Sequence, residues 1–159
     1  YKLPPVRNIT YGGQQEHGLR PGTIPVALVA GLGEACRIAE QEYQSNAIVF
    51  GNIKKQLVKL LRESGLSYEI NGDQEYCIDS TINVSINGVS SEALMLAAKQ
   101  YCGVYNSNSY NLSYVLKAMN IDEDKIKSSI RVSWGAGADE KQIVKEFARL
   151  LEIARSLIF

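Results

Sequence analysis

The sequence lacks the features that mark several large classes of protein. Its 17 basic and 17 acidic residues give a formal net charge of zero. A chain without excess positive charge is not expected to present a broad surface to nucleic acid or to an anionic membrane. No apolar run approaches the roughly 20 residues of a membrane-spanning helix. These absences argue against a membrane-spanning protein and against a nucleic-acid-binding one.

Cysteine and histidine are also scarce. The three cysteines, Cys36, Cys77 and Cys102, are odd in number and have no metal-ligand spacing, so we expect reduced thiols rather than a disulfide framework. The first five residues lack the apolar region of a signal peptide, which makes the cytoplasm the expected location. The chain begins with Tyr1 rather than Met, and its first dozen residues show no periodicity, as is typical of the interior of a longer protein.

Apolar residues at helical spacing predict two consecutive helices, from Val26 to about Gln44 and from about Ala47 to Glu63. Ser64 and Gly65 should end the second helix. Gly31 and Gly33 are expected to permit close packing of the first. The expected buried stripes are Val29, Leu32, Cys36 and Ala39 in the first helix and Val49, Ile53, Leu57, Leu60 and Leu61 in the second.

The rest of the chain predicts a small sheet covered by helices. Strands are expected at 67–70, 81–87 and 130–134, and the second of these alternates apolar and polar residues with period two. Helices are expected at 90–99, with Leu94, Leu96 and Ala97 inward, at 113–119, and from Asp139 to about 157, where Asp139 and Gln142 have capping-box spacing. The inward stripe of the last helix is Ile143, Phe147, Leu150, Leu151, Ala154 and Leu157.

The most distinctive segment runs from Gly12 to Thr23. It combines four glycines with glutamine, carboxylate, imidazole, guanidinium and hydroxyl side chains, directly ahead of the first helical pattern. Glycine lets a backbone approach a ligand closely, and a hydroxyl with free N–H groups before a helix suits an anion such as phosphate. The segment therefore indicates either an anion-binding loop or a plain surface connection.

Four segments, in order, carry a family resemblance that spans nearly the whole chain. They match the patterns GGGQExGxRxGT, PNTLNVSF, PSHVLxAM and SSIRxSxG of the cysteine desulfurases, which are pyridoxal-phosphate (PLP) enzymes of the class V aminotransferase family. The chain resembles the C-terminal portion of such an enzyme. The matching segments are 12–23, 79–85, 113–119 and 128–135.

This resemblance implies a fold and a domain organisation. The expected fold is α/β, the C-terminal small domain of a fold-type I PLP-dependent transferase. Residues 1–25 would be a remnant of the large PLP-binding domain that forms a dimer-facing loop. Residues 26–44 would form a connecting helix, and 45–159 the small domain.

The resemblance also assigns roles to single residues. Arg131 matches the arginine that binds the substrate carboxylate, a task for which a planar guanidinium is suited because it makes two parallel bonds. Thr23 matches a threonine that reaches the PLP phosphate of the neighbouring subunit. Gln15 and Arg20 would shape the dimer-facing loop, with Glu16 as the partner of Arg20. A surface salt bridge for Arg131 and a helix N-cap role for Thr23 remain alternatives.

The catalytic parts of the family are incomplete in this sequence. The PLP-binding lysine of the family lies in a His-Lys pair, but the one histidine, His17, is followed by glycine and is expected to be inert. Counting back from Ser113, the position of the nucleophilic cysteine falls on Tyr105, which cannot relay sulfur. Cys102, three residues earlier, is either a displaced nucleophile or a small packing residue. The loop 103–111 is expected to be the most mobile internal segment.

Three functions follow as alternatives. The first is the C-terminal part of a cysteine desulfurase-like enzyme, a PLP-bound homodimer at full length that passes sulfur from L-cysteine to an acceptor protein; the isolated chain would be inactive. The second is a catalytically dead homologue that holds a partner in sulfur transfer. The third is another class V aminotransferase or lyase, which needs no cysteine nucleophile. Iron–sulfur cluster assembly, tRNA thiolation and DNA phosphorothioation are all served by such enzymes.

Overall fold

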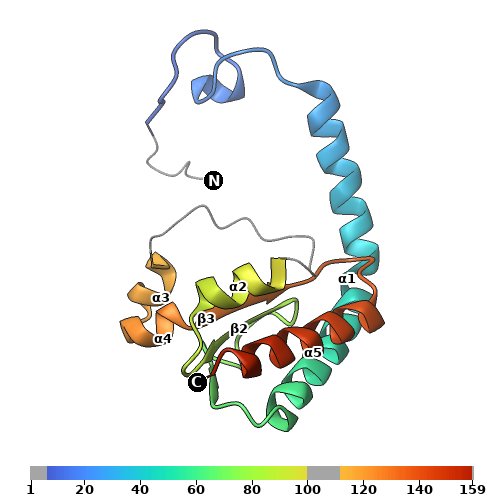
Figure 1. The fold of residues 1–159 in the computed structure, drawn as a ribbon. Helices are drawn as coiled ribbons and strands as arrows, with labels where there is room; N and C mark the ends of the chain where they lie inside the picture. Colours follow the sequence, from blue (N-terminus) through green and yellow to red (C-terminus); the bar gives the residue numbers. More distant parts are fainter. Residues whose placement is uncertain (1–6, 100–111, 159) are drawn as a thin grey trace. The chain divides into compact units, whose positions relative to one another are not determined.

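A computed structural model describes residues 7–99 and 112–158. The chain divides into two compact units, with the boundary between Tyr43 and Gln44. The first unit contains a short 3₁₀ turn, η1 (Glu16–Gly18), and the beginning of the long helix α1 (Val26–Glu63). The second contains the rest of α1, a three-stranded sheet and the other helices (Figure 1).

The prediction of two helices between residues 26 and 63 is wrong, because α1 is one helix of 38 residues. The polar residues Gln44, Ser45 and Asn46 separate the two apolar patterns, but none of them is a glycine or proline. Each costs only a fraction of a kcal/mol in a helix, so they do not interrupt it. Gly65, with a φ of 71°, follows the end of the helix as predicted.

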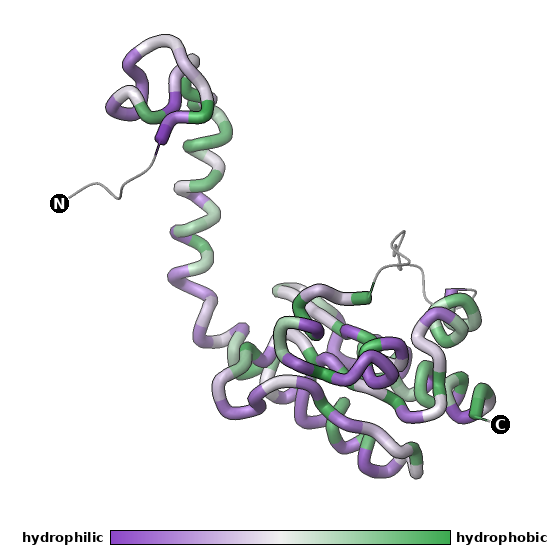
Figure 2. Tube along the Cα trace, turned by 90° about the vertical axis from the view of Figure 1, so that its left-hand side faces the viewer, coloured by the Kyte–Doolittle hydropathy of each residue, from purple (hydrophilic) through white to green (hydrophobic). Residues whose placement is uncertain are grey.

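The two halves of α1 differ in burial. Ile53, Leu57 and Leu61 are fully buried, as the sequence predicts. The stripe predicted for the first half is not buried, since the exposed fraction is 53 % for Val29 and 65 % for Leu32. Apolar stretches nevertheless recur along this half (green in Figure 2). The close packing expected at Gly31 and Gly33 is also absent from the described residues, because a Cβ added to either would meet no atom within 4 Å.

The sheet has the strand order β1-β2-β3 and is antiparallel throughout. Strand β1 (Tyr68–Ile70) and strand β3 (Ser129–Ser133) flank β2 (Thr81–Ile86). Val84 in the central strand pairs with Ile70 on one side and Ile130 on the other. The period-two alternation predicted for β2 is confirmed, because Ile82, Val84 and Ile86 all turn into the core.

One cluster of buried residues joins the sheet to three helices, α1, α2 (Ser91–Lys99) and α5 (Glu140–Ser156). In α2 the buried residues are Leu94 and Ala98, four positions apart on one helical face. Leu96, predicted to point inward, is 69 % exposed because it lies on another side of that helix. The stripe predicted for α5 is confirmed in its centre by its buried residues Phe147, Leu150, Leu151 and Ala154.

Two short helices, α3 (Tyr114–Ala118) and α4 (Glu123–Lys127), lie between α2 and β3 in the sequence. Helix α4 was not expected, because its one apolar residue, Ile126, gives no periodic signal. The cap predicted for α5 is confirmed: the Asp139 carboxylate accepts hydrogen bonds from the backbone N–H groups of Lys141 and Gln142, at 2.9 and 3.2 Å.

Candidate functional site

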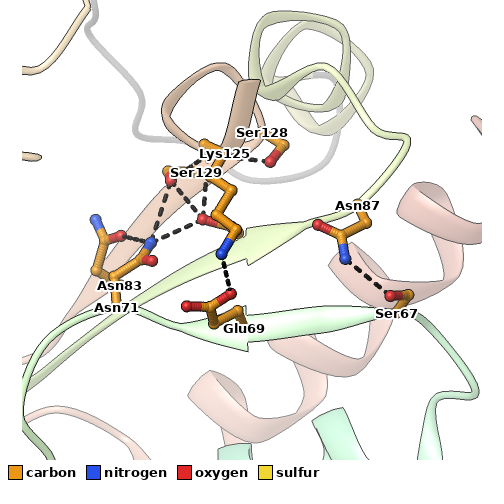
Figure 3. Close-up of polar contacts among 9 residues, drawn as sticks. Ser67, Glu69, Asn71, Asn83, Asn87, Lys125, Ser128 and Ser129 are labelled. Carbon is orange, nitrogen blue, oxygen red and sulfur yellow. Dashed lines mark hydrogen bonds and ion pairs between the residues drawn. The ribbon is translucent and has the colours of Figure 1, made fainter. Parts of the chain in front are cut away.

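The face of the sheet that points away from the core is polar. Successive residues of a strand alternate between the two faces, so the residues between the core positions of β2 and β3 share this outer face. Asn83 and Ser129 are two of them (Figure 3). Ser85 is fully buried there, whereas Arg131 is exposed. The residues that β2 and β3 contribute are Thr81, Asn83, Ser85, Ser129, Arg131 and Ser133.

The Asn71 side chain links the three strands across this face. It follows β1, and its Nδ2 donates to Asn83 Oδ1 at 2.7 Å, to Ser85 Oγ at 2.8 Å and to Ser129 Oγ at 3.2 Å. The Ser85 and Ser129 hydroxyl oxygens also lie 2.8 Å apart. One amide group therefore fixes the positions of β2 and β3 on the face that carries Arg131.

Helix α4 is anchored to the same face through Lys125. The Lys125 carbonyl accepts hydrogen bonds from the hydroxyls of Ser85 and Ser129, at 3.1 and 2.6 Å. The Lys125 ammonium pairs with the Glu69 carboxylate of β1 at 2.5 Å, and this contact raises the pKa of Lys125 (Figure 3). Because Lys125 bonds to one residue of each of the three strands, it fixes α4 to the sheet.

Replacing Asn71 with alanine is expected to lower the free energy of unfolding by about 1–3 kcal/mol, because three part-buried acceptors lose their donor. Urea unfolding followed by circular dichroism measures this change. Asn87→Ala is the matched control, since it removes one exposed hydrogen bond to Ser67 and should stay within about 0.5 kcal/mol. Equal losses in the two variants would contradict a central role for Asn71.

Arg131 lies directly opposite Asn83 in the β2–β3 register. Its side chain is on the polar face, between Ser129 and Ser133 of the same strand. The salt bridge that was the alternative for Arg131 is not formed with any residue in the described part of the chain. The arrangement gives a guanidinium on a strand paired with β2, exposed to solvent and so accessible to an anionic ligand.

The glycine-rich loop of the first unit is held by side-chain contacts of its own. Gln15 Oε1 accepts a hydrogen bond from the backbone N–H of Gly22 at 3.2 Å. A Cβ at Gly13 would lie 2.4 Å from the same oxygen, so a larger residue there would displace the Gln15 side chain. The Asn8 amide donates to the carbonyl of Gly18. Gln15 thus bonds across the loop to Gly22, and its place at a dimer interface stays a prediction.

One prediction about this loop, the Glu16–Arg20 pair, is wrong, and so is the alternative role given for Thr23. Arg20 donates to the carbonyl oxygen of Thr23 at 3.4 Å, and within residues 7–99 and 112–158 no ion pair joins it to Glu16. Glu16 instead has a left-handed backbone with a φ of 51°, as does His17 at 56°. Thr23 is not the N-cap of α1, because the helix begins three residues later, at Val26. The hydroxyl of Thr23 is therefore not committed to capping.

The structure also contains a side-chain cluster that the sequence did not reveal. The ammonium of Lys54, on α1, lies 2.8 Å from Cys77 Sγ and 3.2 Å from Asp79 Oδ1. No spacing rule connects residues more than 20 positions apart. The only available signal was that Lys54 directly follows Ile53 in the buried stripe of α1.

Cys102, Tyr105 and the loop 103–111 lie outside the described residues. In the part that the structure describes, no group of three or more His, Cys, Asp or Glu residues is placed to hold a metal ion. None of the helices described there has the length and apolar character that crossing a membrane requires.

Comparison with known proteins relates this chain to one family. No family model matches it. A cysteine desulfurase from Pongo abelii is 35 % identical over 142 residues, 87 % of this chain and 31 % of that protein. The cysteine desulfurase IscS of Haemophilus influenzae is 35 % identical over 139 residues, 85 % of this chain and 34 % of that protein. By sequence, the chain is a relative of the cysteine desulfurases. It spans about a third of the length of these curated relatives.

The fold agrees with this relationship. A solved NifS-like protein superposes with a TM-score of 0.81 at 29 % identity, and the match covers 96 % of this chain and 40 % of that one. The prediction of an α/β fold like that of a PLP-dependent transferase small domain is confirmed.

For a cysteine desulfurase relative, the residues described here fit one end of PLP. Thr23 is exposed, and the Arg20 guanidinium lies 3.4 Å from the carbonyl oxygen of Thr23, so the same short loop carries a hydroxyl residue and a positive charge. This combination suits a phosphate group. The sequence contains no His-Lys pair, so the covalent attachment of the family cannot be made at such a pair within these 159 residues.

Proposed function

We propose that this chain forms the C-terminal part of a PLP-dependent cysteine desulfurase, which removes sulfur from L-cysteine and passes it to an acceptor protein in the cytoplasm. The observation that carries the proposal is the exposed Arg131 on the polar sheet face of a fold shared with NifS-like proteins. Because the chain spans about a third of its curated relatives, the activity belongs to a protein that also supplies the PLP-binding lysine.

In this proposal Arg131 binds the carboxylate of L-cysteine. A guanidinium makes two parallel charge-assisted bonds to a carboxylate, which fixes both the position and the orientation of the substrate. The pairing of β3 with β2 and the hydrogen bonds of Asn71 keep the strand under Arg131 in place. The arginine is then ready to bind without reordering its backbone.

In the same proposal the glycine-rich loop contacts the cofactor, through Thr23, Gln15 and Arg20. Thr23 would donate a hydrogen bond from its hydroxyl to the PLP phosphate of the neighbouring subunit in a homodimer, and Arg20 would add positive charge beside it. Gln15 links two parts of the loop, because its side-chain oxygen accepts a hydrogen bond from the backbone N–H of Gly22. Once bound, PLP supplies the electron sink for the chemistry, while the protein supplies binding and orientation.

One observation favours a second candidate function. The position of the nucleophilic cysteine of the family falls on Tyr105, whose side chain cannot carry a persulfide. A homologue without desulfurase activity, which holds a partner in sulfur transfer, fits that residue. In the first candidate, Cys102 takes the place of the nucleophile. Cys102→Ser in the longer protein distinguishes the two, because it abolishes persulfide formation only if Cys102 is the nucleophile.

The isolated 159-residue chain is expected to release no sulfide from L-cysteine and to lose its visible PLP absorbance on dialysis, because the His-Lys pair is missing. The same assays on a protein that joins this chain to a PLP-binding part should give both signals. Sulfide release by the isolated chain would contradict the division of roles proposed here. A joined protein that retains PLP but forms no persulfide would favour the second candidate.

A further inference from the structure

Three consecutive residues of the glycine-rich loop have a left-handed backbone. The φ angles are 51° at Glu16, 56° at His17 and 76° at Gly18. Glycine adopts this conformation freely, but in any other residue it brings the Cβ too close to the following carbonyl oxygen. Residues of this kind normally occur singly. A run of three therefore has to be held in place by the surrounding structure.

The backbone hydrogen bonds of this turn do not select its left-handed form. The N–H of Gly18 donates to the carbonyls of Gln14 and Gln15, at 3.1 and 3.0 Å, and the N–H of Leu19 donates to the carbonyl of Glu16 at 3.0 Å. A right-handed turn makes bonds between the same positions, without the close approach of the Cβ atoms. These bonds close the turn, and its handedness needs a further contact.

Asn8 supplies such a contact from outside the turn. Its side-chain amide donates to the carbonyl oxygen of Gly18, ten positions later in the sequence, and Asn8 is half-buried. The direction of the Gly18 carbonyl changes with the handedness of the turn, because φ and ψ set the orientation of each peptide group. The bond from Asn8 therefore favours the left-handed form over the right-handed one.

The segment after the turn is short and is also held at its far end. Only three residues separate Gly18 from Gly22, whose N–H donates to Gln15 Oε1 at 3.2 Å. Arg20 lies in the middle of this segment, and Thr23 follows it directly. A change in the direction of the turn at Gly18 would therefore move both residues.

We propose that Asn8 is a positioning residue for the phosphate group of PLP. By holding the left-handed turn at Gly18, it fixes Arg20 and Thr23 in the arrangement that receives the phosphate. The choice of PLP as the ligand rests on the proposed function, whereas the effect of Asn8 on the turn does not. Asn8 itself makes no contact with the cofactor in this proposal.

Amide exchange with water in the 159-residue chain tests the effect of Asn8 on the turn. Magnetisation-transfer NMR resolves the fast exchange of loop amides, so it is the measurement of choice. In Asn8→Ala we expect the N–H groups of Gly18 and Leu19 to exchange roughly three- to tenfold faster, as for the loss of one hydrogen bond. Ile9→Ala is the matched control, because Ile9 is the next residue and is 94 % exposed, and it should change neither rate.

A second substitution separates this role from a general loosening of the loop. His17→Gly removes a Cβ that opposes the left-handed turn, so in that background Asn8→Ala should accelerate exchange at Gly18 by less than about twofold. Leu19→Gly adds the same freedom at a residue with an ordinary φ of −81°, so the full acceleration should remain. The proposal is overturned if Asn8→Ala leaves the exchange rates unchanged, or if both glycine substitutions reduce its effect equally.

The dissociation constant of PLP, measured by its visible absorbance in the joined protein, tests the consequence for the cofactor. Asn8→Ala should weaken binding roughly three- to tenfold, and adding His17→Gly should restore most of the loss. If Thr23→Val weakens PLP binding and Asn8→Ala does not, this inference is overturned and the proposed function stands. If Thr23→Val has no effect, the proposed contact of Thr23 with the phosphate is wrong, and this inference falls with it.

Discussion

Replacing Arg131 with alanine is expected to raise the KM for L-cysteine about 100-fold or more, in a protein that joins this chain to a PLP-binding part. The substitution removes two charge-assisted bonds to the substrate carboxylate, each worth about 1.5–3 kcal/mol. A loss of about 2.7 kcal/mol already corresponds to 100-fold in affinity. Steady-state rates of sulfide release over a range of L-cysteine concentrations measure the effect.

Two further substitutions separate this effect from a general change of charge. Arg131→Lys keeps the charge but makes a single point contact, so about 1–3 kcal/mol of binding should be lost. Arg62→Ala removes an exposed arginine at the end of α1 and should leave the KM unchanged. If Arg131→Ala and Arg62→Ala behaved alike, Arg131 would not be a substrate-binding residue.

Leu57→Ala is expected to lower the free energy of unfolding of the second unit by about 2–5 kcal/mol. Leu57 is fully buried in the cluster that joins α1 to the sheet and α5, so its truncation leaves a cavity as well as losing apolar burial. Equilibrium unfolding in urea, followed by the fluorescence of the single tryptophan, Trp134, measures the loss within this unit.

Leu28→Ala is the matched control, because Leu28 is on the same helix but 75 % exposed. It should change the unfolding free energy by no more than about 0.5 kcal/mol. A loss at Leu28 as large as that at Leu57 would mean that the first half of α1 is buried in the folded protein, contrary to the structure.

The parts of the fold that the sequence predicts well are those with a regular apolar pattern. In β2, Ile82, Val84 and Ile86 alternate with polar residues, and only one register buries all three. In α5, a capped amphipathic pattern fixes both the start of the helix and its inward face. Such patterns are local, so they can be recognised in the sequence without knowledge of the tertiary structure.

The continuity of α1 and the existence of α4 could not be obtained in this way. Three polar residues separate the two apolar patterns of α1, but helix propensity penalises them too weakly to end the helix. Helix α4 buries a single apolar residue, Ile126, and is positioned by hydrogen bonds from Ser85 and Ser129 to the Lys125 carbonyl. Neither effect appears in hydrophobic periodicity.

In the candidate site, too, some features could be predicted from the sequence and others could not. The family resemblance singled out Arg131, and the strand alternation accounts for its place on the polar face. The hydrogen bonds of Asn71 and the contact of Lys54 with Cys77 depend on the path of the segment that connects β1 to β2. Tertiary packing sets that path. The sequence alone does not indicate which residue a polar side chain will bond to.

The binding of L-cysteine and cysteamine, which differ only in the carboxylate, tests the substrate-binding role of Arg131 most sharply. Both are measured as ligands of the joined, PLP-containing protein, with Arg131 intact and with Arg131→Ala. We expect the intact protein to bind L-cysteine at least about 100-fold more tightly than cysteamine, and the substitution to reduce this preference to a few-fold. A preference that is unchanged in Arg131→Ala would contradict the assignment of Arg131 to the substrate carboxylate.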